Sequence, residues 1–410
     1  MLSWRTIERL SLQSELSIIT LQGQELCGYG NAQSPMPYKV YTMNKYERRK
    51  SKRELKRNNY ISQYQNFDNV ASIPSLYEAA WNSAKGVMWK QSTQRYLLNI
   101  YFQIAKTSKM LYKGKDIRKG FNRFFINERG KVREINSVKF FERVVQKSLC
   151  TNILIPILTH NLIADNGASQ KGKGNDYAQQ RLVKHLCDYY RKYGKDGYVL
   201  TIDFKSYFAN IEHDTLKKLF RKYFTDERVI KLADDFVDAF GDIGLGLGSE
   251  TSQTFAISYV NEIDHFIKDN LGIKAYGRYM DDSYIIHPDK NVLKDILSRL
   301  NFYFEKYGIK MNKNKTCIRK LSQGFTFLKT RFYLGETGKI IRKPCRDSIT
   351  RERRKIKKHA KLYKQGVLQI ETINQSFKSW TGSMERRNSR KTVYNMELLY
   401  NKLFMKGEEK

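Results

Sequence analysis

Residues 275–287 read AYGRYMDDSYIIH, and this stretch constrains the fold more than any other part of the chain. Two adjacent aspartates, Asp281 and Asp282, lie between runs of high strand propensity, so we expect a β-hairpin that carries both carboxylates at its turn. Carboxylates held this close repel one another, and each raises the pKa of the other unless a positive charge lies between them. An isolated pair of aspartates is more often an exposed turn, so a cation site requires further ligands.

A third carboxylate, Asp203, ends the apolar run VLTID, which we expect to be a buried strand. If this strand pairs antiparallel with the hairpin, the three carboxylates come together at one edge of the sheet. Mg²⁺ prefers a few carboxylates, with waters and substrate phosphates completing its shell. Two such ions about 3.5–4 Å apart activate an attacking hydroxyl and stabilise a leaving phosphate oxygen. The carboxylate pattern therefore predicts phosphoryl transfer.

The net charge of the chain indicates its partner. The 410 residues contain 75 Lys and Arg against 41 Asp and Glu, a formal net charge of +34. With 40% apolar residues the chain can pack two or three domains, so the charge belongs to a folded protein that binds a polyanion, nucleic acid first. A membrane partner is not expected, because no apolar segment approaches the roughly 18 residues of a spanning helix. The five scattered cysteines favour free thiols and a cytoplasmic location.

The order of the expected elements predicts the fold class. Residues 1–74 form a basic extension, and its densest run, 44–60, is either a solvated arm or a nucleic-acid contact. The next patterns predict helices over 75–112, a hairpin over 121–137 and a helix over 138–158, followed by a glycine-rich loop over 164–177 and a helix. A strand and helix over 197–216 and a helix over 244–270 precede the aspartate hairpin. A helix over 292–307, two strand segments and a basic helical end complete the chain. This order predicts an α+β fold with an antiparallel central sheet.

Six motifs in order resemble those of reverse transcriptases. YMDD resembles the family's catalytic signature, and the other five are FINERGKVREI, TIDFKSYF, LGSETSQTFA, MNKNKT and FTFLK. Leu328-Lys329, within the last motif, resembles the primer grip, where the family usually has glycine at the position of Lys329. The resemblance covers about residues 75–400 and implies a right-hand polymerase. It would consist of the basic extension (1–74), fingers (75–200), a catalytic palm (201–335) and a helical basic thumb (336–410).

The resemblance implies a metal site. Asp203, Asp281 and Asp282 would be the catalytic residues and would bind two Mg²⁺ ions, which Mn²⁺ could replace. The backbone carbonyl of Phe204 would be a further ligand.

The resemblance also implies contacts with the incoming dNTP, made by Lys131, Arg133, Phe208, Leu247, Gly248, Gln253 and Lys315. Lys131 and Arg133 would clamp the triphosphate, where the guanidinium fork suits phosphate geometry, although without the resemblance both would be read as a solvated face. Phe208 matches an aromatic steric gate that rejects a 2′-hydroxyl, and its alternative interpretation is a core aromatic. Lys315 matches a lysine that donates a proton to the departing pyrophosphate.

The residues around Gly248 indicate which group of reverse transcriptases the chain resembles most. Leu247-Gly248 followed by Ser252-Gln253 resembles the reverse transcriptases of diversity-generating retroelements, whereas retroviral enzymes have glutamine before this glycine and proline after the serine. The leading hypothesis is an RNA-directed DNA polymerase of a bacterial or phage retroelement that copies a structured non-coding RNA into DNA. An accessory protein or a second copy of the chain is a further expected partner.

Two alternatives stay open. The long extension favours an anti-phage defence reverse transcriptase that works with a dedicated non-coding RNA. A non-catalytic RNA-binding scaffold is the alternative of another class, and the three intact carboxylates argue against it.

Overall fold

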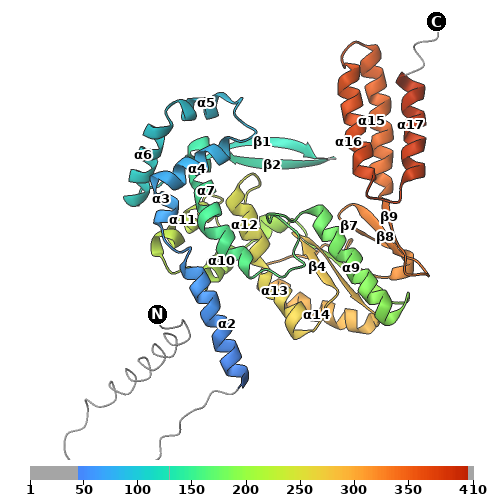
Figure 1. The fold of residues 1–410 in the computed structure, drawn as a ribbon, viewed down its shortest axis with the longest axis horizontal. Helices are drawn as coiled ribbons and strands as arrows, with labels where there is room; N and C mark the ends of the chain where they lie inside the picture. The colour runs from blue at the N-terminus through green and yellow to red at the C-terminus, as the bar shows by residue number, and fades with distance from the viewer. Residues whose placement is uncertain (1–44, 129, 405–410) are drawn as a thin grey trace, which may run out of the picture. The chain divides into compact units, whose positions relative to one another are not determined.

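The computed structural model describes residues 45–128 and 130–404 (Figure 1). The chain divides into two compact units, Met1–Lys56 and Arg57–Lys410. Within the first unit the structure describes only the beginning of helix α2 (Lys45–Ser62), and residues 1–44 of the predicted extension, with Cys27, lie outside the described residues. Among the helices that the structure describes, none is both long and apolar enough to cross a membrane.

The second unit begins with a helical layer and a hairpin. The helices are α3 (Asp68–Ala71), α4 (Ile73–Ala84), α5 (Gln91–Leu98), α6 (Ile100–Tyr112), α7 (Phe140–Leu149) and α8 (Ile155–His160). A π-helical turn, Cys150–Leu154, joins α7 to α8, so the helix predicted over 138–158 is present with a bulge in its middle. Strands β1 (Phe121–Glu128) and β2 (Lys131–Val138) form the predicted antiparallel hairpin.

The main core starts earlier in the chain than residue 75. Ile61, Phe67, Val70 and Ala71 fall within the predicted extension, yet all four are buried among the residues of the helical layer. Because these side chains are apolar and the preceding run is strongly basic, the change in composition near residue 60 marks where packing begins.

A four-stranded antiparallel sheet lies at the centre of the second unit. Its strands are β3 (Tyr198–Asp203), β4 (Tyr276–Tyr279), β5 (Asp282–His287) and β6 (Cys317–Lys320), in the order β4-β5-β3-β6. All of its strand pairs are antiparallel, which confirms the predicted α+β class.

The two faces of this sheet follow from the alternation of side chains along each strand. Leu200 and Ile285 belong to the large core, which also contains buried residues of α10 (His213–Phe220), α11 (Glu227–Asp238), α12 (Glu250–Tyr259), α13 (Asn261–His265) and α14 (Lys290–Lys306). Their neighbours Val199 and Ile286 belong instead to a second core, which they share with α9 (Asn175–Tyr193). Both faces of the sheet are therefore covered by apolar packing. Polar side chains lie instead at the edge where β3 ends and β5 begins.

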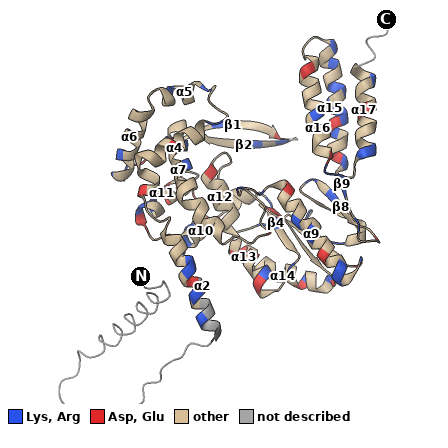
Figure 2. Cartoon of the chain, in the orientation of Figure 1, with Lys and Arg blue, Asp and Glu red and all other residues tan. Residues whose placement is uncertain are grey.

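The chain ends in a small sheet and three helices. Strands β7 (Phe325–Phe327), β8 (Thr330–Leu334) and β9 (Ile340–Pro344) form the sheet, of which β9 has no counterpart in the sequence-based expectation. Helices α15 (Arg346–Lys364), α16 (Ile370–Met384) and α17 (Arg390–Phe404) share a third core of their own, built around Trp380 and Tyr400. Figure 2 shows Lys and Arg along these helices, as the predicted basic helical end requires.

Candidate active site

The strand register of the central sheet brings the three predicted aspartates to one edge. Asp203 is the last residue of β3 and lies directly opposite Asp282, the first residue of β5. Asp281 occupies the turn between β4 and β5, and its carbonyl accepts a hydrogen bond of 3.1 Å from the amide of Phe204. The hairpin and the neighbouring strand therefore lie as the sequence predicts.

A buried ion pair, Arg278 with Asp264, supports the turn that carries Asp281. The Arg278 guanidinium donates to the Asp264 carboxylate at 2.7 Å, and both side chains are 1% exposed. The same guanidinium donates to the carbonyls of Ile257 and Met280, at 2.8 and 3.1 Å. Since Met280 immediately precedes Asp281, Arg278 fixes the backbone that carries the carboxylates. The pair was missed from the sequence, although an arginine inside an apolar strand signals a buried partner.

Several non-glycine residues near these carboxylates have a positive φ, which is a strained backbone conformation. Of five non-glycine residues with positive φ in the described chain, Met280, Leu328 and Lys329 flank Asp282, and Ser206 follows Asp203 by three positions. Such conformations cost on the order of 1–3 kcal/mol each and persist where the surroundings impose them. At Lys329, φ is +60°, which explains why the resembling motif usually has glycine there.

Burial disfavours the ionised form of two of the carboxylates, Asp281 and Asp282. Burial raises the pKa of Asp282 to about 7, and the charges of Asp281 and Asp203 add to the rise. Burial also raises the pKa of Asp281, while the positive charges of Lys315 and Arg133 act in the opposite direction. The amide of Leu328 donates to Asp282 at 3.3 Å. Negative charge at this edge is thus costly unless a cation lies against it.

Asp203 already has a cation beside it. The Lys315 ammonium donates to one carboxylate oxygen at 2.7 Å, and the Asn312 amide donates to the other at 3.0 Å. The backbone amide of Asn312 also donates to the Asp203 carbonyl at 2.8 Å. Lys315 therefore lies within the site, as the motif predicts.

No group of three or more His, Cys, Asp or Glu side chains within residues 45–128 and 130–404 is arranged to hold a metal ion. The chemistry of the donor set nevertheless fits divalent cations: all donors are hard oxygens, two of the carboxylates have raised pKa values, and a cation would relieve their repulsion. The Phe204 carbonyl stays a predicted ligand.

The predicted triphosphate clamp lies on the exposed hairpin. Lys131 and Arg133 are both exposed on β2, and the Arg133 guanidinium pairs with Glu128 at 2.8 Å. The charge of Arg133 acts on the pKa of Asp281, so this side chain is close enough to influence the carboxylates. The structure does not show a contact of Lys131 with them.

The other predicted nucleotide contacts lie on two turns. Phe208 is half-buried in a 3₁₀ turn after β3, and its carbonyl accepts from the amide of Leu245 at 2.7 Å. The Leu247 carbonyl accepts from the amide of Asn136 on β2 at 2.8 Å, which ties the glycine-rich turn to the hairpin. Gly248 has φ +111°, and a Cβ there would lie 3.0 Å from Ile135.

Gln253 is exposed on α12, whereas its neighbour Ser252 is buried.

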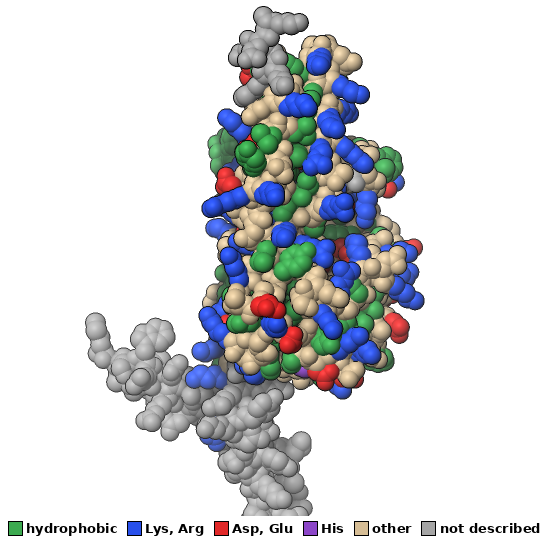
Figure 3. Space-filling model, turned by 90° about the vertical axis from the view of Figure 1, so that its right-hand side faces the viewer, with side chains coloured by type: hydrophobic (Ala, Val, Ile, Leu, Met, Phe, Trp, Pro, Cys, Tyr) green, Lys and Arg blue, Asp and Glu red, His purple; other side chains and the backbone are tan. Residues whose placement is uncertain are grey.

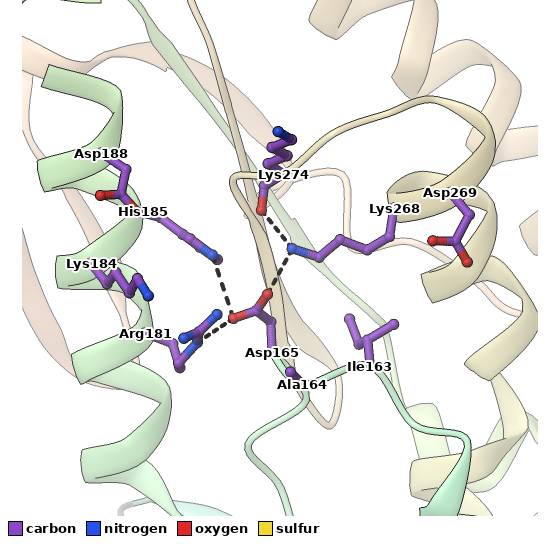
Figure 4. A pocket seen from close by; sticks show the side chains of 10 residues that line it. All are labelled: Ile163, Ala164, Asp165, Arg181, Lys184, His185, Asp188, Lys268, Asp269 and Lys274. Carbon is purple, nitrogen blue, oxygen red and sulfur yellow. Dashed lines mark hydrogen bonds and ion pairs between the residues drawn. The ribbon is translucent and has the colours of Figure 1, made fainter. Parts of the chain in front are cut away.

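A second cluster of charged side chains surrounds Asp165 (Figure 4). This buried carboxylate accepts from Arg181 at 2.5 Å and Lys268 at 2.7 Å, and His185 lies 3.4 Å away. Burial alone would raise the pKa of Asp165, but hydrogen bonds from His185 and Arg181 outweigh it and hold the pKa well below its usual range. These residues line an open hollow of about 400 Å³.

The cluster is joined to the catalytic hairpin through the backbone. The Arg278 amide donates to the Asp165 carbonyl at 3.1 Å, the Gly167 amide donates to the Arg278 carbonyl at 3.0 Å, and Asn166 bridges to Arg278. The loop thus continues the sheet beyond β4. Sequence reasoning missed this cluster, because its members come from three separate segments.

Comparison with known proteins gives a match at the level of a family. The model of the family described as reverse transcriptase (RNA-dependent DNA polymerase) matches residues 126–332, from β1 to β8. No curated protein matches the chain.

Solved structures with similarity include apo telomerase from Candida tropicalis truncated from its C-terminal domain, at 15% identity and TM-score 0.45, covering 54% of this chain and 55% of that one. Telomerase from Candida albicans in complex with a TWJ fragment of telomeric RNA has 13% identity and TM-score 0.43, covering 56% and 46%. The chain thus spans about half the length of these structures.

Proposed function

The chain belongs to the reverse transcriptase (RNA-dependent DNA polymerase) family, and from this premise we propose that it copies RNA into DNA from dNTPs at the edge formed by Asp203, Asp281 and Asp282. The observation that carries the proposal is the register that sets Asp203 opposite Asp282, with Asp281 on the adjoining turn. A merely structural edge would gain nothing from two carboxylates whose ionisation burial opposes.

We propose that the three carboxylates and the Phe204 carbonyl hold two Mg²⁺ ions. When bound, the ions would activate the attacking hydroxyl and stabilise the leaving phosphate oxygen. The chain's own residues would support this chemistry: Arg278 fixes the turn, and the Lys315 ammonium, 2.7 Å from Asp203, would donate a proton to the departing pyrophosphate.

The nucleotide would lie between the carboxylates and the β1–β2 hairpin. Arg133 acts on the Asp281 charge and would meet the triphosphate, with Lys131 beside it. Phe208 is half-buried, so one part of its ring is available beneath the sugar as a steric gate. Leu247 and Gly248 would close the pocket, since their turn is bonded to β2, and Gln253 is exposed at the start of α12.

The domain assignment follows the same proposal. We assign fingers to residues 61–200, since the buried side chains before residue 75 pack with the helical layer, palm to 201–335 and thumb to 336–410. The separate core of α15–α17 supports an independent thumb. Leu247-Gly248 with Ser252-Gln253 supports a retroelement enzyme of the diversity-generating type, whose template would be a structured RNA.

A primer-extension assay tests the proposal. The full chain is given a primed RNA template, dNTPs and Mg²⁺, and Asp281→Asn and Asp282→Asn are compared with Asp295→Asn, an exposed aspartate on α14. We expect the first two variants to slow extension by about a hundredfold or more, because each removes a metal-binding charge. RNA binding should change little, since Lys and Arg contacts with phosphate dominate it. Extension by Asp282→Asn at the rate of Asp295→Asn would overturn the site.

A further inference from the structure

Helices α4 and α6 expose an aromatic cluster that the proposed reaction does not use. Tyr77 and Trp81 on α4 and Tyr101 on α6 are 37%, 41% and 74% exposed. The rings of Tyr77 and Tyr101 stack with centroids 5.9 Å apart, and Tyr77 meets Trp81 edge-on at 6.3 Å. The three rings, called the aromatic platform below, therefore form one continuous surface.

The fold itself does not account for this exposure. Helix α4 buries Leu76, Ala80 and Ala84 in the main core, so its packing face is already satisfied. An adjoining side of the helix presents Ile73, Tyr77 and Trp81, which recur every fourth residue and are exposed. Further large apolar side chains are exposed nearby in sequence: Met88, Trp89, Leu98 and Phe102. Contiguous exposed apolar surface of this kind marks an interaction site.

The platform lies in a strongly basic part of the chain. Residues 73–115 contain seven Lys and Arg residues and a single acidic one, Glu78. All seven basic side chains are exposed: Lys85, Lys90, Arg95, Lys106, Lys109, Lys113 and Lys115. The charge complements a polyanion and disfavours a second copy of this chain, whose identical face would repel it.

Aromatic faces surrounded by cations suit single-stranded nucleic acid. Unpaired bases stack on exposed rings while lysine and arginine contact the phosphates, and the stacking is tolerant of sequence. A duplex keeps its bases stacked inside and would use only the cations. Figure 1 shows α4 and α6, which carry the platform, to the upper left of β4 and apart from it, so the platform is separate from the aspartate edge.

We propose that the aromatic platform binds a single-stranded stretch of the RNA template outside the catalytic cleft. The proposal rests on the proposed function only in naming RNA as the polymer. The platform would then hold the template segment that has not yet entered the catalytic cleft.

The test measures binding of an unstructured single-stranded RNA to the full chain. The variant Tyr77→Ala, Trp81→Ala, Tyr101→Ala removes the rings, and Tyr77→Phe, Trp81→Phe, Tyr101→Phe retains them. Phe302→Ala, which removes a 69% exposed ring from α14, is the matched control. We expect about tenfold weaker binding for the alanine variant and near wild-type binding for the other two. Binding of an RNA duplex of the same length should change by less than about twofold.

Three results would overturn the proposal: unchanged single-strand binding by the alanine variant, an equal loss for single strand and duplex, or a change in oligomeric state with RNA binding intact. Primer extension on a primed template whose single-stranded overhang is long enough to be copied but too short to reach the platform separates this inference from the proposed function. The alanine variant should extend such a template at the wild-type rate. If the wild-type chain itself fails to extend it, the proposed function falls while the binding result stands.

Discussion

The half-buried carboxylate of Asp282 couples the stability of the site to pH. Its pKa is raised from 3.8 to about 7, chiefly because burial removes water from the carboxylate. Folding therefore disfavours the ionised form, so the destabilising effect is absent below about pH 4, grows between about pH 4 and 7, and is constant above. A divalent cation would compete with the proton for this side chain and reverse the penalty.

We predict that Asp282→Asn stabilises the chain at pH 8 in the presence of a chelator and has little effect near pH 4. The rise from 3.8 to about 7 corresponds to at most about 4 kcal/mol of unfolding free energy. Urea unfolding of variant and wild type across this pH range measures the difference. The exposed Asp295→Asn should show no such trend. A difference that is the same at both ends of the range would show that Asp282 ionises normally.

At the scale of elements, the loop around Asp165 joins helix α9 to the catalytic hairpin. The Asp165 side chain accepts from Arg181 of α9 and from Lys268, which follows α13, while its carbonyl is bonded to β4. Removing one partner of a buried ion pair leaves the other charges uncompensated. The loop, the helix and the strand should therefore loosen together.

We predict that Asp165→Asn lowers the free energy of unfolding by about 3 kcal/mol at pH 7. Because the pKa of Asp165 is held below its usual range, its contribution is present above about pH 4 and is lost as the pH falls. Asp188→Asn, an exposed aspartate beside the same hollow, should cost less than about 1 kcal/mol. Equal losses from the two variants would contradict the role of the cluster.

The same elements show what local sequence signals can predict. The β4–β5 hairpin and the strand ending at Asp203 were predicted from short apolar runs around aspartates, and the register then brought them together without further information. The Asp165 cluster was out of reach because it joins a loop, α9 and the segment after α13, whose separate patterns are ordinary. Only the tertiary packing makes these charges neighbours.

At the scale of the whole molecule, charge is spread rather than concentrated. Residues 1–56 contain ten Lys and Arg against five Asp and Glu, a small share of the net charge of +34. Helix α15 alone contains nine basic residues against two acidic ones. Figure 3 shows Lys and Arg scattered over the face that carries the C-terminal helices. We therefore expect RNA affinity to be the sum of many separate contacts between Lys or Arg side chains and phosphates, and we expect α2 to make a few of them.

We predict that replacing Arg48, Lys52 and Lys56 of α2 by glutamine weakens RNA binding and lowers its salt dependence. The three side chains are exposed and spaced four residues apart, so they lie on one side of the helix. Each lost phosphate contact should lower the slope of log K against log salt by about 0.7–0.9. Lys290→Gln, Lys294→Gln, Lys306→Gln on α14 removes the same charge and is the matched control. If both triple variants lower the slope equally, only net charge matters and α2 is a solvated arm; a loss confined to the α2 variant identifies it as an RNA contact.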